Sequence, residues 1–543
     1  DVVNGSYNFP ADFRFWNLPG DPDPHEQAAA LGRNYLGTVM VYAAGNERAK
    51  GGNTNDSNFT KSRWTITVGA INATGDLGSL IADVKPFSNP GASILVSAPG
   101  SNIASTSRLI QSDGGSTFGT EYSTAEGTSL ATPIVSGIVA LMLEANPNLR
   151  YRDVQEILAM SAKNVTDSAT DWTYNTSTRW NAGGMQVSHD YGFGEVDALA
   201  AVRLAESWRP AKDYLNETSV SAQNNSGGSI PDGAGYIERT FTIAAGVTAE
   251  HVELSLNLTH DHLGDLVVEL YSPTWTKSVL MNRPGKAPGS DASDTGDNLS
   301  GLLVTTLSTV HDWGEDSGGT WRVRIYDAAE GNAGSLGDMT LSVYGESASA
   351  GDDTYVFTNE YSTLFAGSTR STLSDSNDGF DTINAAAVTT ASTINLASGS
   401  TSTIAGKSLV LSGMFESAVG GDGDDSLMGT ADFNDLAGGR GNDTLSGGDA
   451  PDFLDGGQGN DNLAGGAGPD MFVIKADPGS TDTILDFSPT QAVEKILIVG
   501  FDNISDFTQL DIVDDGSDTV ISLGQGQTVV LKGVTRAELS EQN

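Results

Sequence analysis

The sequence predicts a chain of several domains: an α/β domain with a mainly parallel sheet, an antiparallel β-sandwich and a repetitive parallel β-structure. Three patterns along the 543 residues predict this order. Helical and strand patterns alternate up to about residue 205, which favours a parallel sheet flanked by helices. Apolar and polar residues alternate in short runs over 215–346, which is typical of antiparallel strands. From Gly420 onward glycine recurs every nine residues, which is typical of stacked β-repeats.

The composition restricts the class of partner. The chain has 70 Asp and Glu against 28 Lys and Arg, a net charge of −42, and no cysteine. Such a surface repels nucleic acid and anionic membranes. Length and composition fit a secreted protein of several domains. Because disulfides cannot stabilise this chain, calcium is the expected stabilising ligand. No apolar run approaches the ~20 residues that span a bilayer, and we predict no membrane insertion.

Short apolar runs define the elements of the first domain. The pattern of Glu26 to Leu36 predicts an amphipathic helix, and the apolar run 39–44 predicts a buried parallel strand that ends at Asn46. The runs 65–70 and 93–98 predict further strands. From Ile134 to Leu143 the pattern is apolar nearly all round, which predicts a helix inside a core.

The run Gly-Thr-Ser-Leu-Ala-Thr-Pro at 127–133 places Ser129 at the start of that helix. Glycine permits a sharp turn before the serine, and Thr128 is a candidate helix cap. The unpaired N–H groups and the dipole at a helix start favour negative charge. A hydroxyl held at this position is well placed to act as a nucleophile.

Residues 127–133 resemble the nucleophile motif of subtilisin-like serine proteases, and residues 143–155 look like the kexin/proprotein-convertase branch. The resemblance covers about residues 1–206, a partial α/β subtilisin-like domain. It implies that Ser129 is the nucleophile and that Asn46 donates into the oxyanion hole. It also implies substrate-binding roles for positions in two segments: Ser6, Tyr7 and Asn8 on a substrate-pairing edge, and Asp56 and Ser57 at the pocket for the residue before the scissile bond.

The base of the reaction is harder to assign. The family orders its catalytic residues Asp, His, Ser, and both partners should precede residue 6. We therefore expect this sequence to be the C-terminal part of a longer protein, with the triad Asp and His upstream of residue 1. None of the six histidines stands in a His-Gly-Thr context. His25 is predicted to be a solvated residue at a helix start rather than a displaced base.

Residues 215–346 resemble the P domain of proprotein convertases, a β jelly roll that in that family packs against the protease domain. The resemblance is carried by Gly264-Asp265-Leu266, Trp313-Gly314-Glu315 and Gly319-Thr320-Trp321. Asp261 and Asp265 are either calcium ligands or, as we favour, turn and strand-edge residues. Residues 347–419 are rich in Ser, Thr and Ala and are expected to form short strands and linkers.

The nine-residue units begin at Gly420, Gly429, Gly438, Gly447, Gly456 and Gly465. Their pattern is that of the RTX repeat, a calcium-binding parallel β-roll, which we assign to residues 420–473. Aspartate at the sixth position offers hard oxygen ligands for Ca²⁺. The predicted metal ligands are Asp425, Asp443, Asp452, Asp461 and Asp470. Two units depart from the pattern, that of Asn434 and the one that begins at Gly447, and both are expected to bind weakly or not at all.

Residues 474–543 resemble the C-terminal region of RTX exoproteins, which commonly carries an uncleaved signal for the type I secretion machinery. The resemblances together imply a secreted, calcium-dependent serine endopeptidase of a Gram-negative-type bacterium, acting on protein or peptide substrates. Two alternatives remain. One is a catalytically degenerate subtilase that serves as a calcium-dependent adhesin or surface scaffold, and the other is a matrix-binding module without catalysis.

Overall fold

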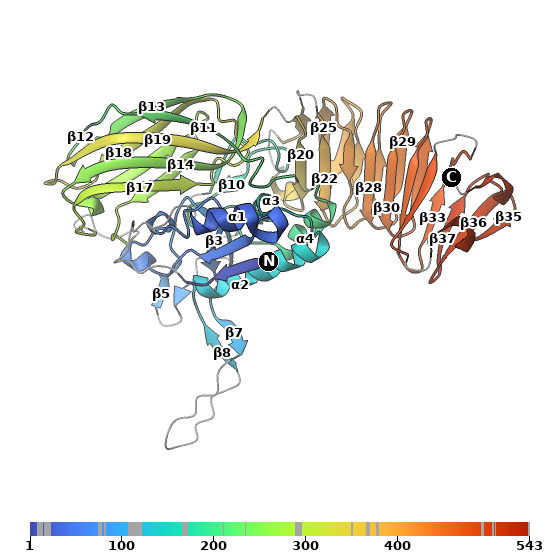
Figure 1. Cartoon of the computed structure of the whole chain (residues 1–543), viewed down its shortest axis with the longest axis horizontal. Coiled ribbons are helices and arrows are strands. Elements are labelled where there is room, and N and C mark those ends of the chain that lie inside the picture. Colours follow the sequence, from blue (N-terminus) through green and yellow to red (C-terminus); the bar gives the residue numbers. More distant parts are fainter. Residues whose placement is uncertain are drawn as a thin grey trace, which may run out of the picture. The chain divides into compact units, whose positions relative to one another are not determined.

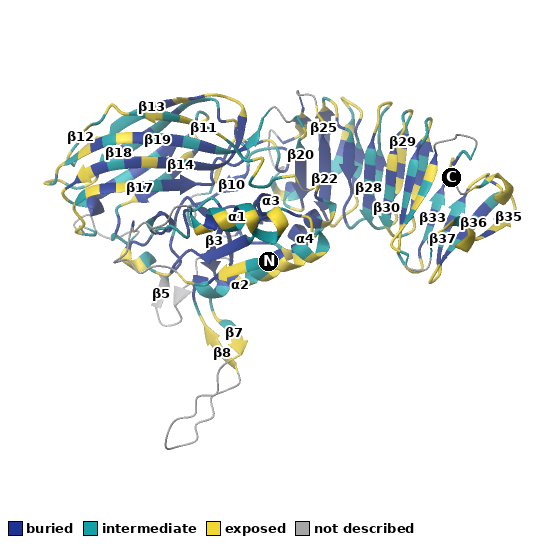
Figure 2. Ribbon diagram, viewed as in Figure 1, coloured by how far each residue is buried: buried dark blue, intermediate teal, exposed yellow. Residues whose placement is uncertain are grey.

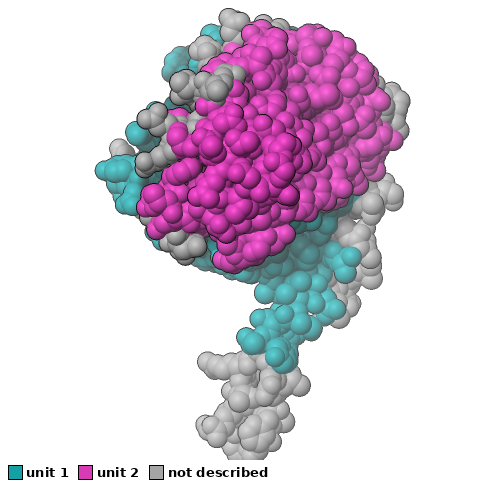
Figure 3. Space-filling model, turned by 90° about the vertical axis from the view of Figure 1, so that its right-hand side faces the viewer, with its two compact units in different colours: residues 1–177, 184–349 teal, residues 178–183, 350–543 magenta. Residues whose placement is uncertain are grey.

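A computed structural model describes residues 1–7, 15, 23–73, 79–80, 83–106, 122–165, 172–209, 211–233, 235–287, 296–348, 351–364, 370–375, 379–489, 494–501, 504 and 506–540. The chain divides into two compact units (Figure 3). The first contains residues 1–177 and 184–349, and the second contains residues 178–183 and 350–543. An α/β domain and a β-sandwich form the first unit, and long β-sheets form the second (Figure 1).

A parallel sheet with strand order β1-β2-β3-β6 forms the centre of the α/β domain. Every residue of β2 and β3 is buried, which explains why these strands appear as continuous apolar runs in the sequence. The predicted parallel sheet is confirmed. Its strands are β1 (Val2–Gly5), β2 (Val39–Ala43), β3 (Thr65–Ile71) and β6 (Ile94–Pro99). Short strand pairs surround it: β4 (Ser79–Leu80) with β5 (Asp83–Pro86), β7 (Ile103–Thr106) with β8 (Tyr122–Ala125), and β9 (Thr173–Tyr174) with β10 (Gln186–Val187).

The α-helices in the described part of this domain are α1 (Pro24–Tyr35), α2 (Thr128–Ala145), α3 (Tyr151–Ser161) and α4 (Ala198–Ser207). Asp23 caps α1, because its carboxylate accepts a hydrogen bond from the His25 amide at 2.8 Å. The helix leaves helical geometry at Gly32–Asn34, before the end that the sequence predicts. By contrast, α3 is buried along its whole length.

Helix α2 is buried on one side only (Figure 2). Val135, Val139 and Met142 are fully buried, whereas Gly137 and Leu141 are exposed, Leu141 to 50%. The prediction that this helix is enclosed in a core is wrong for its exposed face. An apolar pattern in the sequence does not show which other elements will cover the helix. By length and composition alone, α2 is the one helix among the described residues that would pass as a membrane span.

The β-sandwich consists of two antiparallel sheets over a shared apolar core that includes Leu254, Leu341 and Trp321, as the alternating pattern predicts. One sheet contains β11 (Thr218–Asn224), β12 (Gly228–Ile230), β14 (Val247–His260), β17 (Gly301–Thr309) and β19 (Gly334–Ser347). The other contains β13 (Ile237–Ile243), β15 (Leu266–Tyr271), β16 (Lys277–Asn282) and β18 (Gly319–Asp327). The carboxylate of Asp265 accepts a hydrogen bond from the Asn332 amide at 2.9 Å.

Buried charges join the sandwich to the α/β domain within the first unit. Arg152 of α3 donates from Nε and Nη2 to the two carboxylate oxygens of Glu250 on β14, each at 2.8 Å. Both side chains are at most 2% exposed. Arg63 makes a second ion pair across this contact, to Glu253 at 3.3 Å. Bidentate geometry of this kind is strongly directional, so it fixes how the two domains pack.

The second unit is a β-roll whose parallel strands alternate between two sheets. One apolar side chain per nine-residue unit fills its centre. These residues are Leu427, Leu436, Leu445, Leu454, Leu463 and Phe472, all with 0% exposure. Glycine is required where turns of successive coils meet, since a Cβ on Gly448 would lie 1.6 Å from the carbonyl oxygen of Thr430.

Residues on both sides of the repeats contribute strands to the same two sheets. One sheet contains β20 (Thr354–Thr358), β22 (Thr382–Ala387), β26 (Ser417–Val419), β28 (Asp435–Arg440), β30 (Phe453–Gln458), β32 (Met471–Lys475) and β34 (Lys495–Val499). The other contains β21 (Thr372–Ser374), β23 (Thr393–Asn395), β24 (Thr401–Ile404), β25 (Lys407–Ser412), β27 (Ser426–Met428), β29 (Thr444–Gly448), β31 (Asn462–Gly466), β33 (Thr481–Ile484), β35 (Asp511–Asp515), β36 (Asp518–Gly524) and β37 (Gln527–Leu531).

Candidate active site

Ser129 lies in the first turn of α2 and is half-buried. The residue before the helix is Gly127, whose φ of 146° is a conformation that L side chains rarely adopt. The Gly127 amide donates to the Gly100 carbonyl at 2.8 Å, which ties this turn to the end of β6. The sheet therefore holds the start of α2, and with it Ser129, in a defined position.

Asn46 follows β2 and contacts the same turn. Its Oδ1 accepts hydrogen bonds from the Thr128 amide at 2.8 Å and from the Thr128 hydroxyl at 2.9 Å. Because a backbone N–H can only donate, this contact fixes the orientation of the Asn46 amide and leaves its NH₂ group as a donor. The side chain is exposed. The structure thus places a donor amide beside the turn that carries Ser129.

Thr128 does not cap α2 through its side chain, contrary to the sequence-based expectation. The N-cap residue is Gly127, and no side-chain capping bond is present there. Instead the Thr128 hydroxyl accepts a hydrogen bond from the Gly45 amide at 3.1 Å while it donates to Asn46. The hydroxyl is used to join the end of β2 to the helix, a tertiary contact that local sequence cannot reveal.

The predicted substrate-pairing edge lies next to Ser129. The Ser6 hydroxyl donates to the Ser129 carbonyl at 2.8 Å and accepts from the Asn4 amide at 2.8 Å. Tyr7 is 57% exposed and packs edge-on against Tyr42 and Phe59. Asn8 lies outside the described residues.

The predicted pocket residues occupy a short turn that the sheet supports. Asp56 ends a 3₁₀ helix (Thr54–Asp56), and its carboxylate accepts from the Asn53 amide at 3.0 Å. Ser57 is 4% exposed, and its hydroxyl accepts from the Phe59 amide at 3.3 Å. The Asp56 carboxylate is therefore directed, at least in part, back into its own turn.

His25 is buried, contrary to the predicted solvated position. It is 5% exposed, and its ring packs against the rings of Tyr42 and Phe59 at centroid distances of 5.6 and 5.5 Å. Its Nδ1 lies 3.0 Å from Asp23 Oδ1. These aromatic partners are distant in sequence, so the pattern around His25 gave no signal of its burial. Among the described residues, no histidine is hydrogen-bonded to Ser129.

The repeat aspartates form two rows along the roll, linked at intervals of 18 residues. In the first row Asp425 N donates to Asp443 Oδ1 at 2.7 Å, and Asp443 N donates to Asp461 Oδ1 at 2.8 Å. In the second row Asn434, Asp452 and Asp470 are linked in the same way. Each link uses one carboxylate oxygen of the accepting residue. At the start of the first row, both oxygens of Asp425 accept hydrogen bonds, from the amides of Ser392 and Gly421.

Three of the remaining oxygens have no protein partner in the described part of the chain. Oδ2 of Asp443, Asp452 and Asp461 is buried without a hydrogen-bond partner among the described residues. Burial and neighbouring carboxylates raise the pKa of Asp443 to about 8, and burial and the Asp470 carboxylate raise that of Asp452 to about 7. Buried acceptors that repel one another are the donor set that Ca²⁺ satisfies.

Two positions in these rows differ from the repeat pattern. Asn434 keeps its place in the second row, but its Nδ2 donates to the Glu416 carbonyl at 3.2 Å, and the side chain carries no charge. Asp482 extends the first row, because its Oδ1 accepts from the Asp461 amide at 3.2 Å. Asp482 falls outside the nine-residue pattern of the sequence, since its spacing from Asp461 is 21 residues instead of 18.

Comparisons with known proteins agree with this architecture. Residues 1–194 match the Subtilase family, residues 249–343 the proprotein convertase P-domain, and residues 419–454 and 437–472 the RTX calcium-binding nonapeptide repeat. The chain therefore carries a subtilase domain, a P domain and RTX repeats.

Individual relatives cover part of the chain. Furin from Mus musculus is 31% identical over 334 residues, which are 59% of this chain and 38% of furin. Kexin from Saccharomyces cerevisiae is 29% identical over 350 residues, which are 63% of this chain and 40% of kexin. The serine protease of Aeromonas sobria has a TM-score of 0.51 at 25% identity, and the match covers 64% of this chain and 71% of that one. The chain spans about two fifths of the length of these curated relatives.

Proposed function

We propose that the chain is part of a secreted, calcium-dependent serine endopeptidase that hydrolyses protein or peptide substrates. The observation that carries this proposal is the contact between Asn46 and Thr128, which holds a donor amide beside the turn of Ser129. The similarity to kexin and furin supports the same reaction class. Type I secretion from a Gram-negative-type bacterium follows from the RTX resemblance.

In the proposed reaction, Ser129 Oγ attacks the carbonyl carbon of the scissile peptide bond. The Asn46 NH₂ group donates to the oxygen as it gains negative charge. A histidine expected upstream of residue 1 takes the serine proton and passes it to the leaving amine. The hydrogen bond from Ser6 to the Ser129 carbonyl keeps the nucleophile's backbone in place during this exchange.

The proposed specificity is a weak preference for Arg or Lys before the scissile bond. Ser57 stands where the resemblance places an acidic pocket residue, and Asp56 accepts a hydrogen bond from the backbone of its own turn. A basic side chain would therefore meet less negative charge than in kexin-like enzymes. Strict dibasic cleavage in a peptide-library profile would contradict this part of the proposal.

Casein hydrolysis with and without Ser129→Ala tests the proposed activity. An enzyme form that includes the upstream Asp and His should cleave casein, be blocked by serine-directed inhibitors and lose turnover in Ser129→Ala. The 543-residue chain alone should hydrolyse peptides very poorly, because nucleophile and base act as a unit. If Asp-Ser/Thr-Gly and His-Gly-Thr motifs are absent upstream in the intact protein, the degenerate adhesin or scaffold becomes the better explanation.

A further inference from the structure

Strand β17 is an edge strand of the P-domain sheet, and among the described strands it pairs only with β14. The outward N–H and C=O groups of an edge strand have no partner within their own sheet. At Ser308 both are taken by one side chain of the subtilase domain. Asn55 Oδ1 accepts from the Ser308 amide at 2.8 Å, and Asn55 Nδ2 donates to the Ser308 carbonyl at 3.0 Å. The Asn55 amide thus replaces the backbone of a neighbouring strand.

Asn55 belongs to the segment that carries the proposed substrate pocket. We call residues 53–60, which include Asp56 and Ser57, the specificity loop. Asn55 is 1% exposed, so its amide has no access to water as an alternative partner. A buried amide that loses both partners pays the desolvation cost of each group. The Asn55–Ser308 pair is therefore a strong constraint on the loop.

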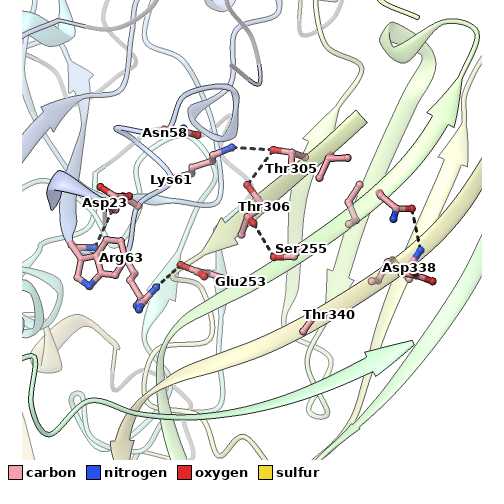
Figure 4. Close-up of a pocket in the computed structure, with 16 residues that line it drawn as sticks. Asp23, Asn58, Lys61, Arg63, Glu253, Ser255, Thr305, Thr306, Asp338 and Thr340 are labelled. Carbon is pink, nitrogen blue, oxygen red and sulfur yellow. Dashed lines mark hydrogen bonds and ion pairs between the residues drawn. The ribbon is translucent and has the colours of Figure 1, made fainter. Parts of the chain in front are cut away.

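Two further contacts join the same edge to the subtilase domain. Lys61, directly after the specificity loop, donates from Nζ to Thr305 Oγ1 at 3.0 Å (Figure 4). The Val310 amide, just beyond β17, donates to the Ala92 carbonyl at 3.0 Å. Asn58 and Lys61 line one wall of a cavity of about 550 Å³ whose other wall includes Thr305 and Thr306.

We propose that strand β17 of the P domain sets the position of the specificity loop through Asn55, and that Asn55 is a positioning residue for substrate selection. The inference rests on the proposed function for its catalytic consequence. Ser57 lies two residues from Asn55 and is held within the same turn, so a shift of Asn55 moves the pocket wall. The P domain then contributes to specificity as well as to packing.

Asn55→Ala is the main test, and Asn55→Gln, which keeps the amide, is the conservative variant. Glu250→Gln is the matched control, because it weakens the same domain contact at the Arg152 ion pair without touching the loop. Hydrogen exchange of the full chain is measured first. In Asn55→Ala, the exchange rate of the amides of residues 53–60 should rise by about tenfold. Glu250→Gln should leave these amides protected, even if it lowers the unfolding temperature of the chain by the same amount.

Substrate selection is measured second, in the active enzyme, as the ratio of kcat/KM for peptides with Arg and with Leu before the scissile bond. Asn55→Ala should change this ratio by about fivefold, since misplacement of a binding group alters orientation, and Asn55→Gln should restore part of it. Unchanged loop exchange in Asn55→Ala, or an equal change of ratio in Glu250→Gln, would overturn the inference. If neither the wild-type enzyme nor any variant cleaved the peptides, but loop exchange still rose in Asn55→Ala, only the proposed function would be contradicted.

Discussion

Among the described residues, Thr128 is the one that hydrogen-bonds to the Asn46 amide. Oδ1 of Asn46 is occupied twice, by the Thr128 amide and by its hydroxyl. In the proposed reaction, the amide therefore presents its NH₂ group without rearrangement when a carbonyl oxygen becomes negative. Preorganised donors of this kind account for much of the rate enhancement in acyl transfer.

Substitutions at these two residues should lower the turnover of the active enzyme by different amounts. Asn46→Ala removes the donor and should lower kcat by about 10²- to 10³-fold. Thr128→Val removes only the hydroxyl and leaves the backbone bond to Oδ1, so we expect a loss of about tenfold. Steady-state kinetics with a peptide substrate measures both. An equal loss in the two variants would show that the hydroxyl, and not the amide donor, governs the site.

At the scale of elements, Lys61 shows the electrostatic cost of the contact between the specificity loop and β17. The side chain is 8% exposed, and burial lowers its pKa from 10.5 to about 8. The unfolded chain keeps the Lys61 proton up to pH 10.5, whereas the folded chain releases it near pH 8. Between these values the unfolded state binds more protons, so stability should rise as the pH rises.

Lys61→Met should remove this rise. Relative to the variant, the wild-type chain should gain on the order of 3 kcal/mol in its free energy of unfolding between pH 8 and 10.5. Below pH 8 the wild type should carry the whole cost of the buried charge, and the variant should be more stable. Denaturant unfolding at several pH values measures the difference between the two proteins. Parallel stability curves for the two would contradict this account.

We expect the stability of the β-roll to depend on calcium, again for an electrostatic reason. Its core is one apolar residue per unit, while the aspartate rows bring like charges together. Calcium that binds the folded rows but not the unfolded chain stabilises the roll by mass action. A chelator should therefore expose residues 420–473 to hydrogen exchange, and Ca²⁺ should protect them cooperatively.

Two matched alanine variants test the role of the rows. Asp443→Ala should raise the calcium midpoint of folding clearly, because Asp443 links Asp425 to Asp461 and has a buried oxygen without a partner among the described residues. Asn434→Ala should raise it less, because the Asn434 amide already donates to the Glu416 carbonyl and supplies no charge. A circular dichroism titration gives both midpoints. The same β signal with and without calcium would rule out the mechanism.

At the scale of the first unit, the P domain and the subtilase domain are joined by a buried ion pair. Glu250→Ala should lower the free energy of unfolding by about 3 to 5 kcal/mol, because it leaves Arg152 charged and buried without its carboxylate partner. Glu238→Ala is the matched control: Glu238 pairs with Arg324 at 2.8 Å but is 32% exposed. Its loss should cost about 0 to 1 kcal/mol. Denaturant unfolding of the full chain measures both, and equal losses would mean that Arg152 is compensated by other groups.

Local patterns in the sequence determined the order of the domains, the strands and the candidate residues Ser129 and Asn46. The repeats were predictable because each unit needs only its own glycines, its aspartate and one apolar residue in register. The parallel strands were predictable because burial on both faces removes alternation.

Tertiary structure decided the features whose partners lie far away in the chain. His25 is buried because Tyr42 and Phe59 close over it. Asn55 is a positioning candidate because Ser308 pairs with its amide across a separation of 253 residues. Asp482 joins the first aspartate row because the folded roll brings it beside Asp461, although the two residues are 21 rather than 18 positions apart. None of these contacts leaves a periodic or local trace, since each depends on which surfaces fold against one another.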